Sequence, residues 1–476
     1  MIQQNTSSKQ LFSLQSLFDF IHMDKILKKA NFVKGGIPAI LLLKAVLAIK
    51  IVGCKNIYEF SKSRLNKIDG FDENTYYNFM ENERFNWREL QLRLAAFIIN
   101  FVQKSFGSVR RRPAFIVDDT MLHRLRSKKV EFLTRLHDHV VHKTLKGFNM
   151  MLLAYTDGFS LFSVCHSVHC SSNPKNRVNN ESPNADKRSA FGMRCKEAFM
   201  KKPDVLISML KEALNRGIKA QHILMDSWYF SDTLLTRLKK LGIDSICLVK
   251  SNLYFYTEND ERLNQKKLFE LSTRENCHKF LTSTIAKTKG GRLVKLVFVR
   301  ANNSKKIITV VSTDLNLSAQ EIIVMYGRRW KIEVTFKVLK QHLGLSTECQ
   351  ARKFASIFAA MAVANMRALL IELHRRMNQD LRTSGEIFHE AVEAAQDVPF
   401  QVALNSLINL ILDLPQKLYE KGIIAKNKIS EAEDLIYEHL DNWYKQTAYF
   451  IQELLGNICK SKQEKHNCIF KEQPQC

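Results

Sequence analysis

Four residues between positions 326 and 340 have the types and the spacing of a phosphate-handling cluster. Tyr326, Arg329, Glu333 and Lys340 fall within an arc of about 60° on one helix, because each helical residue turns by about 100°. This face holds a phenol, two cations and one carboxylate, whereas a solvated face mixes charges more evenly and a core face is apolar. A carboxylate flanked by phosphate-binding cations is the arrangement expected of metal-dependent chemistry at a phosphodiester.

Two further carboxylates come at the ends of short apolar runs, AFIVDD at Ala114–Asp119 and HILMD at His222–Asp226. Both runs are typical of buried strands whose carboxyl ends reach a site. Two Mg²⁺ ions about 3.5–4 Å apart can activate an attacking oxygen and stabilise a leaving one, and three carboxylates suffice to hold them. We therefore predict that Asp119, Asp226 and Glu333 bind two Mg²⁺ ions, for which Mn²⁺ can substitute.

Composition points to an anionic partner. The chain has 476 residues, with 72 Lys and Arg against 47 Asp and Glu and a net charge of +25, so nucleic acid or an anionic membrane is expected. The most apolar stretches, Ile37–Val52 and Phe354–Leu373, hold charged residues such as Lys44 and Arg367 and indicate buried helices rather than membrane spans. Ten Cys without a paired framework fit a reducing cytosol.

The order of elements predicts a mixed α/β sheet flanked by helices. Residues 1–108 show helical periodicity interleaved with Lys, which favours an N-terminal DNA-binding region. Residues 110–375 hold the strands, a hairpin at Asp157-Gly158, a β-rich insertion at about 250–315, and a helix from the Ser318 cap to about His342. Residues 376–476 form a helical C-terminal region, for which dimerisation is a candidate role.

These residues together resemble a known group. The pattern Tyr326-x2-Arg329-x3-Glu333-x6-Lys340 is similar to the YREK signature of bacterial DDE transposases of the insertion-sequence-four family. Asp119 in VDDT resembles the first catalytic Asp of that family, which commonly precedes Thr, and Asp226 in LMDSWYF resembles the second. The 107 residues from Asp226 to Glu333 suit the β-rich insertion that the family places there. The resemblance covers roughly residues 110–375.

The resemblance implies a retroviral-integrase-like (RNase H-like) core. It implies a transposase that binds the terminal inverted repeats of an insertion sequence, cleaves DNA at the ends and joins the freed 3′-hydroxyl to target DNA. Asp119, Asp226 and Glu333 would bind the metal ions, and Tyr326, Arg329 and Lys340 would hold phosphates of the cleaved end. The expected partners are double-stranded DNA and a second copy in a synaptic homodimer, without a membrane, in a bacterial cytoplasm at the nucleoid.

Several alternatives stay open. Neighbouring residues of a strand face opposite ways, so only one of Asp118 and Asp119 serves as the first ligand, and the family motif favours Asp119. Some relatives stack a Trp of the insertion on a flipped base, but this insertion contains no Trp; the substitutes are aromatic residues at positions 254, 255, 256 and 298. An RNase H-like nuclease without strand transfer and a domesticated DNA-binding protein are the competing functions.

Overall fold

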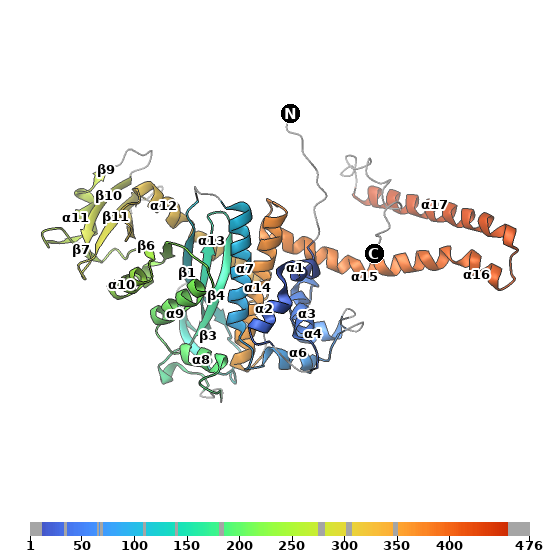
Figure 1. The fold of residues 1–476 in the computed structure, drawn as a ribbon, viewed down its shortest axis with the longest axis horizontal. Coiled ribbons are helices and arrows are strands. Elements are labelled where there is room, and N and C mark those ends of the chain that lie inside the picture. Colours follow the sequence, from blue (N-terminus) through green and yellow to red (C-terminus); the bar gives the residue numbers. More distant parts are fainter. Residues whose placement is uncertain are drawn as a thin grey trace. The chain divides into compact units, whose positions relative to one another are not determined.

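The computed structural model places one compact unit at residues 1–393 and a second at residues 394–476. Figure 1 shows the chain as a ribbon. The structure describes residues 12–32, 36–63, 66, 70–107, 111–138, 141–179, 185–274, 281–300, 307–345 and 351–455.

The strands of the described residues form one mixed sheet of 12. Its central part has the order β4-β3-β1-β5-β6, in which β1 runs antiparallel to β3 and parallel to β5, and β5 runs parallel to β6. The predicted hairpin at Asp157-Gly158 is confirmed, since it joins β3 to β4. Strand β2 pairs with the first residues of β3, on the side of β3 away from β1. The bounds are β1 (Ala114–His123), β2 (Thr134–Asp138), β3 (Lys143–Thr156), β4 (Leu161–His169), β5 (His222–Met225) and β6 (Asp244–Leu248).

Residues 254–312 are rich in strands, as the sequence predicts, and extend the same sheet beyond β6. Their strands follow in the order β12-β11-β10-β7-β8, with β9 beside β10. An apolar core of its own, which includes Phe255 and Phe298, holds this part together. The bounds are β7 (Tyr254–Tyr256), β8 (Arg262–Asn264), β9 (Thr273–Arg274), β10 (Leu281–Lys287), β11 (Leu293–Arg300) and β12 (Ile307–Ser312), with the short helix α11 (Gln265–Glu270) after β8.

Helices cover the central strands. Helices α7 and α14 pack on each other and on β4, and α9 packs on β3 and β4; Figure 1 shows α7 and α14 side by side next to the strands. Because α7 packs on the sheet, the N-terminal helices share one compact unit with it. The DNA-binding role of residues 1–108 stays a prediction. The bounds are α1 (Leu14–Ile21), α2 (Met23–Lys29), α3 (Ala39–Ile51), α4 (Ile57–Lys62), α6 (Glu73–Met80), α7 (Trp87–Phe106), α8 (Ala190–Glu197), α9 (Lys202–Asn215), α10 (Asp232–Lys240) and α14 (Phe354–Met377).

Helix α14 is long and apolar enough to cross a membrane, but its most apolar window is 89% buried inside the protein. Arg367 lies within it and is buried, and its guanidinium donates to the carbonyl oxygens of Val46, Leu47 and Leu343. The Arg367 guanidinium thus joins α14 to the segments of Val46 and Leu343. A helix surrounded by lipid would lack such acceptors for a buried charge. The expectation of a buried helix at this position is therefore confirmed.

The second unit consists of helical segments. The long helix α15 (Ser384–Leu412) leads into it, and α16 (Leu414–Glu420) and α17 (Ile429–Leu455) follow. Helices α16 and α17 contact each other. Their exposed apolar side chains include Leu414, Leu435 and Trp443. The dimerisation role expected for residues 376–476 stays a prediction.

Candidate active site

The segment expected to form one helix from Ser318 to about His342 is two helices, α12 (Ala319–Gly327) and α13 (Trp330–Gln341). The Ser318 cap is confirmed, and it forms a capping box with Glu321. The interruption follows Gly327, where the amides of Arg328 and Arg329 bond to carbonyls three residues back, a tighter turn than the α-helix. The single-helix prediction was wrong at this point, because glycine weakens the middle of a helix.

This junction still brings Tyr326, Arg329 and Glu333 together. The guanidinium carbon of Arg329 lies 5.9 Å from the centre of the Tyr326 ring. Its Nη2 donates to Glu333 Oε1 at 2.6 Å, across one helical turn. Burial raises the pKa of Tyr326 to about 12, so its phenol remains a neutral hydrogen-bonding group at physiological pH.

Asp118 faces this cluster from β1. Arg329 Nη1 donates to Asp118 Oδ2 at 2.8 Å, so one guanidinium bridges the carboxylates of Asp118 and Glu333. Burial raises the pKa of Asp118 to about 6, and the charges of Asp119 and Asp226 act in the same direction. Asp118 therefore lies in a concentration of negative charge that Arg329 offsets in part.

Asp226 lies where the sequence predicted, directly after the last residue of β5. It caps the 3₁₀ turn η2 (Ser227–Tyr229), with its Oδ1 accepting from the amide of Ser227 at 2.6 Å. Its negative charge adds a smaller contribution to the rise in pKa that burial causes in Asp118 and in Tyr326. Since β5 runs parallel to β1 with Leu224 opposite Ile116, Asp226 is level with the middle of β1, where Asp118 lies.

Asp119 has different partners from Asp118. Its Oδ2 pairs with Lys202 Nζ at 2.5 Å, and its Oδ1 accepts from the Tyr229 hydroxyl at 2.9 Å. This follows from the alternation of side chains along a strand, which sends adjacent residues to opposite faces. Burial, followed by the charge of Asp119, raises the pKa of Tyr229, which keeps that hydroxyl a donor. Trp228 lies 52% exposed beside this pair, with Lys202 Nζ 5.1 Å from its ring centre.

Lys340 lies apart from the other three members of its motif. It is half-buried near the end of α13. Burial lowers the pKa of Lys340, and the charge of Asp138 at the end of β2 opposes that shift. Asp138 in turn pairs with His123 Nε2 at 2.7 Å. Lys340 therefore lies toward the His123 end of β1. It is about two helical turns from Glu333, or about 11 Å along the helix axis.

The insertion offers fewer exposed aromatic rings than the sequence suggested. Phe255 and Phe298 are buried at 1% and 0% exposure, which rules out stacking on a base in this conformation. Tyr254 is 46% exposed, and the Arg262 guanidinium carbon lies 4.1 Å from its ring centre. Tyr254 is therefore the exposed candidate among those four positions, with Tyr256 partly buried.

The donor set suits a hard divalent cation, which prefers carboxylate oxygens. Asp118 and Glu333 converge on one cationic group and Asp226 acts on Asp118 through its charge. As they stand, no three His, Cys, Asp or Glu side chains of the described residues are grouped closely enough to hold an ion. The carboxylate oxygens are therefore suitable ligands for a divalent cation. In this structure the guanidinium of Arg329 supplies the positive charge between Asp118 and Glu333.

Two family models match parts of this chain. Residues 201–370, which include Asp226 and Glu333, match the family model of the transposase DDE domain. Residues 53–279, which include Asp118, Asp119 and Asp226, match the model of the DDE superfamily endonuclease. The matches support a DDE transposase or endonuclease. They also imply an RNase H-like fold for the mixed sheet, and DNA as the substrate. No curated protein matches the chain.

Sequence reasoning missed the partners of Asp119. Lys202 lies at the start of α9 and is separated from Asp119 by 83 positions, and Tyr229 follows Asp226 in the next turn. The signal in the sequence was the second Asp itself, since two adjacent acids on a strand need partners on two faces. What the sequence lacked was any indication of which face α13 would cover.

Proposed function

We propose that the chain is a transposase of the insertion-sequence-four type. It binds the terminal inverted repeats of an insertion sequence, cleaves the DNA at its ends and joins the 3′-hydroxyl to target DNA. The observation that carries this proposal is the arrangement of Asp118, Arg329 and Glu333, with Asp226 beside them. The YREK spacing of Tyr326, Arg329, Glu333 and Lys340 supports it.

In this proposal Asp118, Asp226 and Glu333 hold the metal ions. Asp118 replaces Asp119 because its carboxylate shares Arg329 with Glu333, whereas that of Asp119 is engaged by Lys202 and Tyr229. Two divalent ions, Mg²⁺ or Mn²⁺, would activate the attacking oxygen and stabilise the leaving one.

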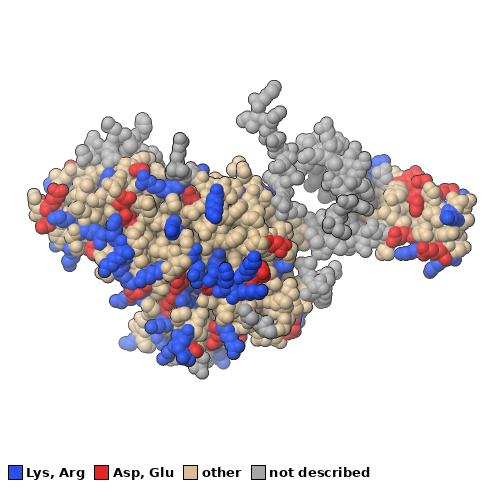
Figure 2. Space-filling view, viewed as in Figure 1, with Lys and Arg blue, Asp and Glu red and all other residues tan. Residues whose placement is uncertain are grey.

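The remaining residues position the DNA. Arg329 presents a planar fork suited to two phosphate oxygens, and Tyr326 offers a neutral hydroxyl next to it. Lys340 supplies a point charge farther along α13. Asp119 orients Lys202 and Tyr229 on the opposite face of β1. Lys and Arg side chains also gather around α9 and α10 on the face shown in Figure 2, and such fields draw DNA to a protein surface.

The wider setting follows from the same proposal. The enzyme would act on double-stranded DNA at the nucleoid of a bacterial cytoplasm, as a homodimer that brings two ends together. A second candidate is a DNA nuclease without strand transfer, which the match to the DDE superfamily endonuclease favours.

A donor-plasmid reaction separates these two functions. Purified protein is incubated with Mg²⁺, a plasmid that carries the gene with its own flanking DNA, and a target plasmid. A transposase should release the element and produce joined products in the target. Cleavage at the ends without joined products would select the nuclease, and intact DNA in both Mg²⁺ and Mn²⁺ would contradict both functions.

Lys340→Ala should weaken binding of end DNA and reduce its salt dependence. One lost phosphate contact lowers the slope of log K against log salt by about 0.9 for duplex DNA. The measurement is a fluorescence-anisotropy titration at several salt concentrations, with Lys337→Ala, an exposed lysine of the same helix, as the control. A slope equal to that of the wild type would argue against a phosphate contact at Lys340.

A further inference from the structure

Five cationic side chains surround the turn between β3 and β4, on segments far apart in the sequence. Phe159, 42% exposed at this turn, lies at their centre. The guanidinium carbons of Arg375, Arg376 and Arg111 lie 4.8, 5.1 and 5.8 Å from its ring centre. We call this group the basic cluster; its members are Arg111, Arg328, Lys331, Arg375 and Arg376.

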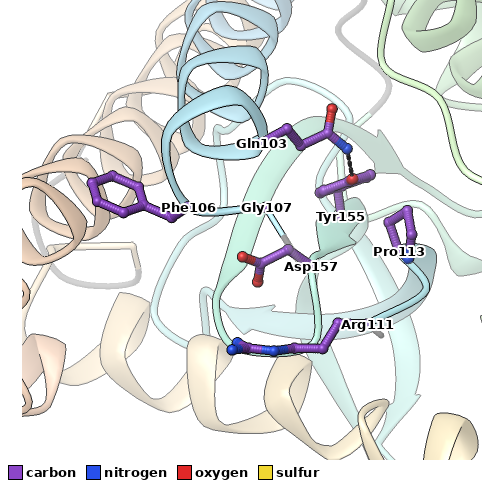
Figure 3. A pocket seen from close by; sticks show the side chains of 7 residues that line it. All are labelled: Gln103, Phe106, Gly107, Arg111, Pro113, Tyr155 and Asp157. Atoms are coloured by element: carbon purple, nitrogen blue, oxygen red, sulfur yellow. Dashed lines mark hydrogen bonds between the residues drawn. The ribbon is translucent and has the colours of Figure 1, made fainter. Parts of the chain in front are cut away.

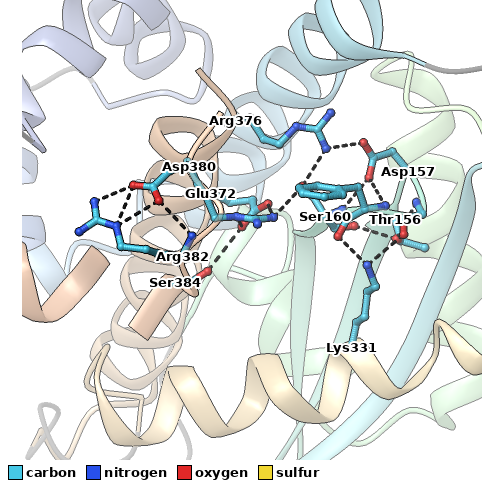
Figure 4. Close-up of polar contacts among 12 residues, drawn as sticks. Thr156, Asp157, Ser160, Lys331, Glu372, Arg376, Asp380, Arg382 and Ser384 are labelled. Carbon is cyan, nitrogen blue, oxygen red and sulfur yellow. Dashed lines mark hydrogen bonds and ion pairs between the residues drawn. The ribbon is translucent and has the colours of Figure 1, made fainter. Parts of the chain in front are cut away.

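The turn is built to receive these cations. Gly158 has a φ of +92°, and a side chain there would meet Arg111 and Arg328 at 3.3 Å. Lys331 Nζ donates to the carbonyl oxygens of Gly158 and Phe159 at 3.0 and 2.5 Å. Figure 4 shows Lys331 pointing up into the turn from α13. The backbone therefore contributes acceptors, but no negative charge.

Charge in the cluster is not balanced. Two carboxylates form ion pairs within it among the described residues: Asp157 with Arg376 at 2.7 Å, and Glu372 with Arg375 at 2.5 Å. Five cations against two carboxylates leave three positive charges uncompensated. Burial lowers the pKa of Arg328 and of Lys331, the charge of Asp157 opposes both shifts, and smaller contributions from neighbouring cations of the cluster act with burial. An additional anion would relieve this repulsion.

The cluster is open to a ligand. Arg111 is exposed and Arg328 is half-buried. A hollow of about 350 Å³ lies directly beside the turn. Figure 3 shows Arg111 extended along its edge, beneath Asp157. A phosphate in this hollow would meet Arg111 without any rearrangement of the buried Arg376. Arg328 lines a neighbouring hollow with Arg112, to whose carbonyl oxygen its Nη1 donates at 2.6 Å.

The position of the cluster relates it to the candidate active site. Thr156, which precedes the turn, pairs with Ala114 at the start of β1. Asp118 lies four residues farther along β1, about 13 Å at roughly 3.3 Å per residue. Phosphates of one DNA strand advance by about 3.4 Å along the helix axis, so this distance corresponds to about four base pairs of a duplex whose axis runs along β1.

We propose that the basic cluster binds the phosphodiester backbone of the DNA duplex about four base pairs from the bond that is cleaved. This inference rests on the proposed function, which makes duplex DNA the substrate. Arg111 and Arg328 carry the contact. The turn is held in place by Lys331, Arg375 and Arg376, which also increase the positive electrostatic potential around it. A free phosphate anion is the other source of the same chemistry.

Salt-dependent binding of a duplex tests the proposal. Arg111→Gln should lower the slope of log K against log salt by about 0.9, and Arg111→Gln/Arg328→Gln by about 1.8. Arg111 is exposed, so the single variant should fold normally even if the double variant does not. The charge-matched control is Lys417→Gln/Lys421→Gln, at exposed positions of the second unit, which should keep the wild-type slope.

Two further experiments test where on the DNA the contact lies and whether the ligand is DNA or free phosphate. Once wild-type cleavage has been mapped, one neutral methylphosphonate about four base pairs from the cut should weaken wild-type binding and leave Arg111→Gln unaffected. Calorimetry with inorganic phosphate tests the free anion. Phosphate binding that Arg111→Gln abolishes, with an unchanged DNA slope, would overturn the DNA contact.

The outcomes keep the two proposals apart. A wild-type protein that cleaves DNA with metal, combined with unchanged slopes in both Arg variants, overturns the cluster and leaves the function standing. Slopes that fall equally in the control and the Arg variants overturn it as well. A wild-type protein that binds duplex DNA through Arg111 and yet cleaves nothing overturns the function alone.

Discussion

Asp118→Asn is expected to abolish metal-dependent DNA cleavage, whereas Asp119→Asn should slow cleavage without abolishing it. Asp118 shares Arg329 with Glu333, and its loss would remove a carboxylate from the set proposed to hold the ions. Metal ions supply several kcal/mol of transition-state stabilisation, and each 1.36 kcal/mol is about tenfold in rate. The expected loss is therefore on the order of 10³-fold or more.

Comparison of the two variants separates a specific loss of a metal ligand from a general effect of charge. Asp118→Asn and Asp119→Asn remove the same charge from adjacent residues of β1, so a general effect of charge on DNA binding would be alike in both. Asp119→Asn should act through Lys202 and Tyr229 and reduce the rate by about 10–100-fold, as supporting contacts of a metal site do. Cleavage of labelled end DNA is the measurement. A reversed order of the two effects would restore Asp119 as the ligand.

Arg88→Met is expected to have the largest effect on stability. Arg88 of α7 is 2% exposed and holds Glu197 of α8 through both carboxylate oxygens, at 2.9 and 2.6 Å. Its Nε also donates to the carbonyl oxygen of His166 in β4. Removing one partner of a buried pair leaves the other charge uncompensated and costs about 3–5 kcal/mol. Arg194, 3.1 Å from Glu197, should keep the cost towards the lower value.

Urea unfolding of the full chain measures this cost. Arg88→Met/Glu197→Gln should recover part of the lost free energy of unfolding, because the charge of Glu197 is then removed together with that of Arg88. The recovery should be incomplete, since among the described residues Arg194 keeps only Glu212, at 4.0 Å. Arg237→Met breaks the more exposed pair with Asp204 and should cost less than about 1 kcal/mol. If Arg88→Met were as mild as Arg237→Met, the ion pair would not hold α7 and α8 to the sheet.

The end of β5, the hairpin turn and the Ser318 helix cap could be predicted from the sequence because their signals are local. Asp226 follows β5 as expected, and the hairpin joins at Asp157-Gly158. The Ser318 cap depends on four consecutive residues, Ser318 to Glu321, which form the capping box. These features depend on nearest neighbours along the chain, so no tertiary contact was needed to infer them.

The choice between Asp118 and Asp119 depended on tertiary structure. Both lie on β1, which runs on to His123 instead of ending at the acids. The packing of α13 against β1 decides which face becomes the site, and no local pattern encodes it. The contact of Arg329 with Asp118 is similar, since the two residues lie 211 positions apart along the chain.

Titration of Mn²⁺ into the wild-type protein, Asp118→Asn and Asp119→Asn, followed by electron paramagnetic resonance, tests the central claim most directly. The claim is that Asp118, together with Asp226 and Glu333, holds the metal ions. The wild type and Asp119→Asn should bind Mn²⁺, and Asp118→Asn should bind it at least about 10-fold more weakly. Normal binding by a folded Asp118→Asn protein, with binding lost in Asp119→Asn, would contradict the account.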